Sequence, residues 1–117
     1  MIKFYGYSKW SSVRKAKAWL EENNLEFENI EIVKNPPSKE ELKEMYEVSG
    51  YELKKFFNTS GVKYRELGLK DIVKTESDEK LLDILSSDGM LIKRPIAYDG
   101  KNVVIGFKVD EWKEMLL

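Results

Sequence analysis

Apolar and polar residues alternate along this chain with two periods, and each period predicts a different element. Short runs rich in β-branched and aromatic residues are typical of strands. Such runs occupy residues 2–5, 27–33, 96–98 and 103–105. Between them, apolar residues three and four positions apart predict helices. The clearest helical stripe is formed by Val13, Ala16, Trp19 and Leu20.

Capping residues and glycines set the expected helix limits. Ser11 or Ser12 is expected to cap a helix that reaches residue 24. Ser38 and Glu41 form a capping box, which predicts a helix from there to residue 48. Gly50 is expected to end that helix. The other predicted helices cover residues 51–57, residues 64–74 with a break near Gly68, a stretch capped by Ser77 and ended by Gly89, and a last stretch capped by Asp110.

The order of these elements predicts an α/β fold. The sequence Asp99-Gly100-Lys101-Asn102 separates the last two strands and is a strong hairpin signal. The right-handed rule for β-α-β units makes the first two strands parallel. We therefore expect one domain over residues 1–117, with a mixed four-stranded sheet built as β-α-β and β-β-α halves. A helical insertion, at about residues 38–88, separates the two halves.

Composition excludes several classes of function. The 20 basic and 21 acidic side chains leave a net charge of −1, which gives no electrostatic case for direct nucleic-acid binding. No apolar run approaches the roughly 18 residues that cross a bilayer, so no membrane partner is expected. No secretory signal precedes the first strand, so a cytoplasmic protein is expected.

The chain contains no cysteine and no histidine. These absences remove disulfides, the commonest metal ligand and the commonest general base. Zinc-finger, Cys–His and Ser–His–Asp chemistries are therefore excluded. No glycine-rich phosphate loop and no distinctive carboxylate pair is present, so we expect neither a metal nor a cofactor.

The stretch YSKWSSVRKAKA, residues 7–18, has the layout of a redox-active strand, turn and helix. Free backbone N–H groups and the helix dipole favour an anion at such a helix start. A cysteine there would be an activated nucleophile. Trp10 and Val13 stand where two sulfur atoms would be expected, and neither side chain can attack a substrate.

The motif Y-S-K-W-S-S-V-R-K-A-K-A-W-L-E-E resembles the Y-x-K-C-x-x-C-R-K-A-x-x-W-L-E-E signature of the arsenate reductase-like family, which also contains the Spx regulators. Further matching segments are PPSKEEL at residues 36–42, FFNTSG at 56–61, YREL at 64–67, DGMLIKRPI at 88–96 and VIGF at 104–107. The resemblance covers nearly the whole chain. It implies a thioredoxin-like fold.

The resemblance also implies roles for particular residues. Pro95 matches a cis-proline that faces the active-site helix, and Arg94 matches an arginine that helps to bind the oxyanion. Guanidinium suits a tetrahedral oxyanion because its donors form a fixed planar fork. Ser60 stands where catalytic members often offer an arginine. The candidate anion-binding residues are Ser11, Ser12, Arg14, Ser60, Arg94 and Pro95.

Three functional hypotheses remain open. The first is a family member without redox cysteines that acts by binding a small oxyanion, a thiol ligand or a protein. The second is an Spx-like transcription regulator that docks on RNA polymerase. Two departures count against it: Glu52 stands where those regulators present a glycine, and the sequence has no extended tail after Leu117. The third is an arsenate or thiol oxidoreductase whose cysteines were replaced. Enzymatic activity is thus left open, and Trp10 and Val13 argue against it.

Overall fold

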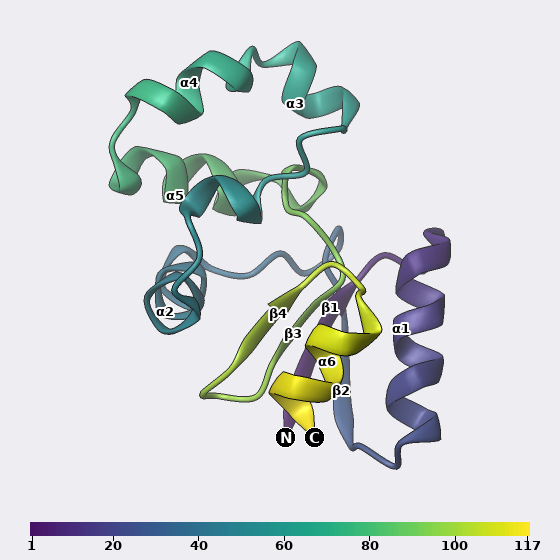
Figure 1. Ribbon diagram of the computed structural model, residues 1–117. Helices are drawn as coiled ribbons and strands as arrows, with labels where there is room; N and C mark the ends of the chain where they lie inside the picture. The colour runs from purple at the N-terminus through teal and green to yellow at the C-terminus, as the bar shows by residue number, and fades with distance from the viewer.

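The computed structural model describes residues 1–117, and its centre is a mixed four-stranded sheet (Figure 1). The strands are β1 (Ile2–Gly6), β2 (Phe27–Glu31), β3 (Ile96–Tyr98) and β4 (Val103–Ile105), in the spatial order β2-β1-β3-β4. β1 pairs parallel with β2 and antiparallel with β3, and β3 pairs antiparallel with β4. The predicted α/β class and mixed sheet are confirmed. β2 is two residues shorter than expected, because the chain turns after Glu31, whose carbonyl accepts from the N–H groups of Lys34 and Asn35.

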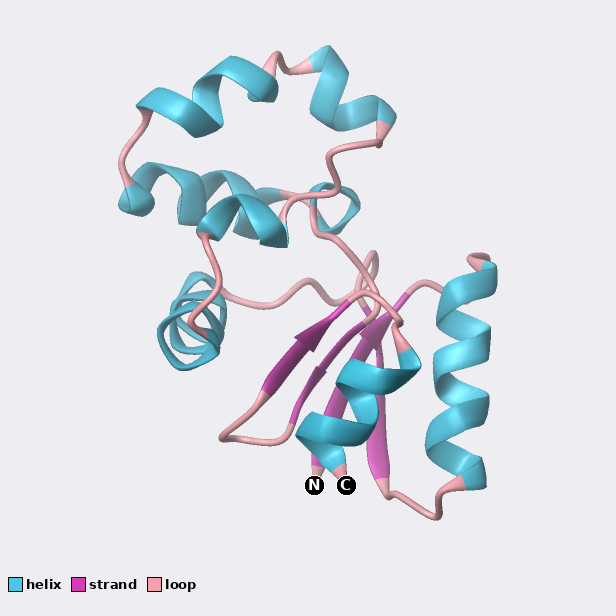
Figure 2. Ribbon diagram, in the orientation of Figure 1, coloured by secondary structure: helices cyan, strands magenta, loops and turns pink.

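One face of the sheet is covered by α1 (Ser11–Glu22) and α6 (Val109–Leu116), which lie side by side in Figure 2. Alternate strand residues point to this face because the side-chain period of a strand is two. These are Ile2, Phe4, Ala97 and Val104, and they pack with Val13, Ala16, Trp19, Leu20 and Trp112 in one buried cluster. Trp112 is at its centre and lies edge-on to the rings of Phe4 and Trp19.

The opposite face carries the larger core. The intervening strand residues Tyr5, Ile96, Tyr98, Val103 and Ile105 pack there with Leu42 and Met45 of α2 (Lys39–Ser49). The same cluster includes Leu81, Leu82 and Leu85 of α5 (Asp78–Ser87). The short helices η1 (Leu53–Phe56), α3 (Val62–Glu66), α4 (Leu69–Thr75) and η2 (Gly89–Leu91) complete the segment between β2 and β3. In Figure 1, α3, α4 and α5 lie beyond one end of the strands, away from both termini.

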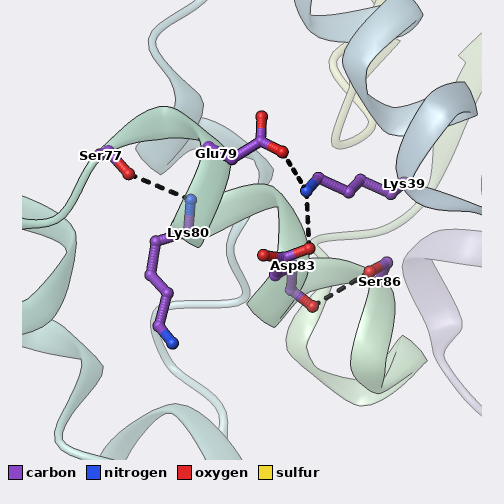
Figure 3. A network of polar contacts seen from close by, with 6 residues as sticks. All are labelled: Lys39, Ser77, Glu79, Lys80, Asp83 and Ser86. Atoms are coloured by element: carbon purple, nitrogen blue, oxygen red, sulfur yellow. Dashed lines mark hydrogen bonds and ion pairs between the residues drawn. The ribbon is translucent and has the colours of Figure 1, made fainter.

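Polar contacts fasten α2 to its neighbours. Figure 3 shows the Lys39 ammonium group between the carboxylates of Glu79 and Asp83 on α5. On the sheet side, the Tyr5 hydroxyl donates to Glu41 at 2.9 Å and the Tyr98 hydroxyl donates to Glu44 at 2.7 Å. These contacts fix the orientation of α2 across the sheet.

The predicted caps are confirmed for two helices and wrong for two. The Ser38 hydroxyl accepts from the Glu41 N–H, and Ser77 does the same for Lys80. In contrast, α1 already begins at Ser11, so Ser11 and Ser12 are helical residues and Trp10 is the N-cap. Asp110 likewise lies inside α6, whose N-cap is Lys108.

Gly89 does not end α5, contrary to expectation, because that helix stops at Ser87 with Asp88 following. Gly89 is instead buried against the backbone of Ile32: a Cβ atom there would lie 2.1 Å from the Ile32 carbonyl oxygen. Close backbone approach therefore requires glycine at this position. None of the helices is long and apolar enough to span a bilayer.

Candidate functional site

A cavity of about 310 Å³ opens beside the start of α1. It is bounded by the start of α1, the loop after η1, the segment before β3 and the connection from β4 to α6. The residues that line it are Trp10, Ser12, Lys55, Asn58, Thr59, Ser60, Lys93, Arg94, Ile105, Gly106, Phe107, Lys108 and Glu111. The topology thus brings four separate stretches of the chain to one hollow.

Arg94 is one of these lining residues, although it is only 2% exposed. Its Nη1 donates to the Met90 sulfur at 3.5 Å, and its Nη2 donates to the Met90 carbonyl oxygen at 3.2 Å. Its Nε is buried without a hydrogen-bond partner. Burial lowers the pKa of Arg94 from its ordinary value, against the opposing effects of Tyr7 and Asp88. The guanidinium group nevertheless remains charged, because the ordinary pKa of arginine is far above neutral pH.

Trp10 covers the guanidinium group. The Arg94 Cζ lies 4.2 Å from the centroid of the Trp10 ring and 5.6 Å from that of Tyr7. This is a cation–π arrangement, in which the negative face of the ring attracts the charge. Trp10 therefore lies at the helix start and also stacks on Arg94, the residue that the resemblance implies would bind the oxyanion.

Pro95 is buried, follows Arg94 through a cis peptide bond, as the resemblance implies, and does not line the cavity. Its carbonyl oxygen accepts from the Gly106 N–H at 2.8 Å. Val13 is 4% exposed and faces the core, not the cavity. It packs so closely on β1 that a Cβ atom at Gly6 would lie 2.5 Å from its Cγ1. Glycine at position 6 lets α1 approach the sheet.

The other expected site residues divide into two groups. Ser12 and Ser60 line the cavity, and the Ser60 hydroxyl is 3.5 Å from the Asn58 side-chain oxygen. Ser11 is exposed and does not line it. Arg14 points elsewhere: its Nη1 donates to the Ser8 carbonyl oxygen, and it lines a different hollow beside β2. The structure therefore does not bring Arg14 to Arg94.

Sequence reasoning missed the lysines of the site. Lys55, Lys93 and Lys108 all line the cavity, although they are far apart in the sequence. Backbone pairing brings the Lys55 and Lys93 segments together, since Lys93 N–H donates to the Phe56 carbonyl and Asn58 N–H donates to the Leu91 carbonyl. No local motif signals this contact. No cluster of acidic side chains in the chain could hold a metal ion.

Comparison with known proteins identifies the family. The ArsC family model matches residues 5–115, so the chain belongs to the ArsC family. It is 56% identical over 113 residues to the uncharacterized protein YusI of Bacillus subtilis, covering 97% of this chain and 96% of that one. It is also 30% identical over 116 residues to the global transcriptional regulator Spx of Streptococcus agalactiae, covering 99% of this chain and 83% of the regulator.

Solved structures agree with this assignment. The fold matches an ArsC-family-related protein from Bacteroides fragilis with a TM-score of 0.93 and 43% identity, over 97% of this chain and 95% of that one. The thioredoxin-like fold that the resemblance implied is thereby confirmed.

Proposed function

We propose that this protein is a non-catalytic binding module of the ArsC family that receives an anionic ligand in the cavity beside Trp10. The observation that carries the proposal is the Trp10 ring stacked 4.2 Å from the Arg94 guanidinium carbon, at the helix start where the family signature has cysteine. A cysteine-free chain has no thiolate with which to attack an oxyanion or a disulfide. Geometry around the site cannot replace that nucleophile.

The cavity retains features that attract an anion. The Trp10 side chain makes no capping hydrogen bond, so the first N–H groups of α1 receive no side-chain acceptor from it. The first turn of α1 contains no acidic residue. Ser12 and Ser60 supply hydroxyl donors at the cavity wall, and the buried Arg94 supplies a positive charge beside it. A small oxyanion or a thiol ligand would fit this chemistry.

In this proposal, residues 1–117 act as one cytoplasmic domain, and the segment of about residues 38–88 is its helical insertion. Ser11 and Arg14 contribute only through the local potential, since neither lines the cavity. Pro95 does not line the cavity either, and in this proposal it makes no direct contact with the ligand.

Turnover assays test the non-catalytic assignment. The unmodified protein is expected to reduce neither arsenate, in the presence of glutathione and glutaredoxin, nor a glutathione mixed disulfide above the rate of the buffer. The measurement is NADPH consumption in a coupled assay. Turnover that scales with the concentration of this protein would refute the proposal.

A cysteine variant tests whether the helix start keeps its anion-stabilising character. Trp10→Cys is expected to react with a disulfide reagent at neutral pH, because a helix N-terminus lowers a thiol pKa. Thr75→Cys is the matched control, since Thr75 is exposed and is the last residue of α4. Equal reactivity of the two thiols at pH 6 would show that the start of α1 no longer favours an anion.

A second candidate function rests on the similarity to the transcriptional regulator Spx over 99% of this chain. Under this alternative, the protein docks on RNA polymerase. Two measurements would distinguish the regulator from the ligand-binding module. The first is a pull-down of RNA polymerase from a lysate of the native host, and the second is direct binding to each purified RNA polymerase subunit. Saturable binding of a purified subunit would favour the regulator, and its absence would leave the ligand-binding module.

A further inference from the structure

A second cavity, of about 340 Å³, adjoins the one beside Trp10. Its lining residues are Glu52, Lys54, Lys55, Phe57, Thr59 and Lys93. Lys55, Thr59 and Lys93 line both cavities, so the two hollows share a wall and form one extended depression. We call it the lysine groove and define it by Lys54, Lys55, Lys93 and Lys108.

The charge of the lysine groove is not neutralised within the protein. All ion pairs in the structure involve Lys39 or Lys63, and none involves a lysine of the groove. The Lys55 ammonium group lies 4.2 Å from the centre of the Tyr51 ring, an aromatic contact that leaves its charge available. Only two carboxylates, of Glu52 and Glu111, line the groove. This local excess of cations stands out in a chain with a net charge of −1.

The charges are spread along the groove and do not converge on one point. Lys54 lines only the second cavity and Lys108 only the first, while Lys55 and Lys93 lie between. The one arginine, Arg94, has its two Nη atoms engaged by Met90. A phosphate group is best held by a converging fork or a nest of N–H groups. A lysine ammonium group is a compact point charge, so lysines set apart along the groove can each meet a separate negative charge of an extended ligand.

Apolar residues also line the two cavities, although Phe57 and Ile105 are only 1% and 4% exposed. Phe57 lies in the second cavity, and Trp10, Ile105 and Phe107 lie in the first. Each cavity alone has the volume of a small-molecule site, typically about 300–1,000 Å³. A tetrahedral oxyanion would leave most of this space unfilled. A peptide with alternating acidic and apolar side chains would place carboxylates on the lysines and apolar groups against the half-buried rings of Trp10 and Phe107.

We propose that the lysine groove binds an extended acidic peptide segment of a protein partner. This inference rests on the proposed binding function and names the class of ligand. Complementary charge across such a contact raises the association rate and sets specificity. Because the groove lysines are exposed or half-buried, binding is expected to weaken as salt increases.

A fluorescein-labelled hexapeptide of alternating Glu and Leu is the probe, and fluorescence anisotropy at low salt is the readout. The expected result is saturable binding that weakens with added salt. A matched peptide with Gln in place of Glu is expected not to bind. If the Gln peptide binds equally well, the groove recognises apolar side chains and not acidic ones, and the proposal is wrong.

Paired variants locate the binding. Lys55→Gln combined with Lys93→Gln is expected to weaken binding of the acidic peptide by about tenfold. Lys43→Gln combined with Lys80→Gln is the control. Both lysines are exposed and lie outside the groove, and the two substitutions remove the same charge. Circular dichroism of each variant verifies folding. An equal loss in both double variants would mean that only net charge matters, which contradicts the proposal.

The outcomes separate this inference from the proposed function. If the acidic peptide fails to bind but arsenate or phosphate quenches tryptophan fluorescence saturably, the small-anion function stands and the peptide inference falls. If a single-stranded oligonucleotide binds more tightly than the peptide through the same lysines, the ligand class is wrong. Turnover by the unmodified protein would instead remove the non-catalytic function itself.

Discussion

Helices α1 and α2 follow the first two strands in the same way, yet they begin with opposite chemistry. α2 begins at Ser38, whose hydroxyl accepts from the Glu41 N–H, and its first turn contains Glu40 and Glu41. α1 begins at Trp10, which makes no side-chain cap, and its first turn contains no acidic residue. The start of α2 is stabilised by its own side chains. The start of α1 is left open toward the cavity.

This difference separates structural from functional chemistry. Caps and acidic residues at a helix start each add a few tenths of a kcal/mol to about 2 kcal/mol of stability. α2 uses both, and polar contacts also tie it to the sheet and to α5. α1 has neither, and the side chain of its N-cap residue, Trp10, stacks on the Arg94 guanidinium instead of capping the helix. Four substitutions, three of them paired with a control variant, test this difference between the two helices.

The largest effect is expected from Trp10→Ala. It removes the ring from a buried cation whose Nε already lacks a partner. Loss of a desolvated cation–π contact is expected to lower the free energy of unfolding by about 2 kcal/mol. Urea denaturation followed by circular dichroism measures the change.

Trp10→Phe is the control for this stacking, because it keeps an aromatic face above Arg94. It is expected to lose less than half of what Trp10→Ala loses. If the alanine variant is as stable as the parent protein, Trp10 does not hold the guanidinium group in place, and the start of α1 is no more specialised than that of α2.

The sequence was sufficient for much of the fold, for reasons seen in individual elements. The hairpin of β3 and β4 was predicted to the residue, because Asp99 both begins the turn and accepts from the Lys101 and Asn102 N–H groups. The helix caps at Ser38 and Ser77 were found because a capping side chain acts within three residues of itself. Gly89 was misread because its role depends on Ile32, which is far away in the sequence.

The candidate site was less accessible to sequence reasoning. Trp10 was found through the strand–turn–helix layout and the family motif, and Arg94 through the family motif alone. Their contact could not be inferred from spacing. The groove lysines carry no local signal, since Lys55 and Lys93 meet only after the Phe57 segment pairs with Ile92. Arg14 was placed at the site by sequence proximity to Trp10. The helix turns its side chain toward Ser8 instead.

The next largest effect is expected where α2 is tied to the sheet. Tyr98→Phe removes the hydrogen bond to Glu44 and is expected to cost about 1.5 kcal/mol, the lower end for a charged acceptor. The hydrogen bond from Tyr98 to Glu44, together with burial, raises the pKa of the Tyr98 hydroxyl to about 12. In the unfolded chain this pKa is about 10.

The pH dependence follows from that raised pKa. Below pH 10 the hydroxyl is protonated in both states, so its contribution to stability is fully present. Between pH 10 and 12 the unfolded chain ionises first, and the contribution is lost. Urea midpoints across pH 9–12 should therefore fall more steeply for the parent protein than for Tyr98→Phe. Parallel curves would show that Glu44 does not influence this hydroxyl.

A smaller effect is expected from the caps themselves. Ser38→Ala removes the side chain that accepts from the Glu41 N–H and is expected to lower stability by about 1 kcal/mol. Ser11→Ala is the matched control, because Ser11 is exposed and lies inside α1. It is expected to change stability by less than about 0.5 kcal/mol. Equal losses in the two thermal melts would mean that Ser11 also caps its helix.

The smallest effect is expected from giving α1 what α2 already has. Ser11→Glu adds an acidic residue to the first turn and is expected to raise the free energy of unfolding by about 0.5 kcal/mol. The same charge opposes an anion at the helix start, so binding of an anionic probe should weaken by about twofold. Ser11→Gln adds a side chain of similar size without the charge, so it should change neither stability nor binding of the probe. If the start of α1 binds the anion, Ser11→Glu should gain stability and lose affinity together. A gain in stability without a loss of affinity would show that the open start of α1 is unconnected with ligand binding.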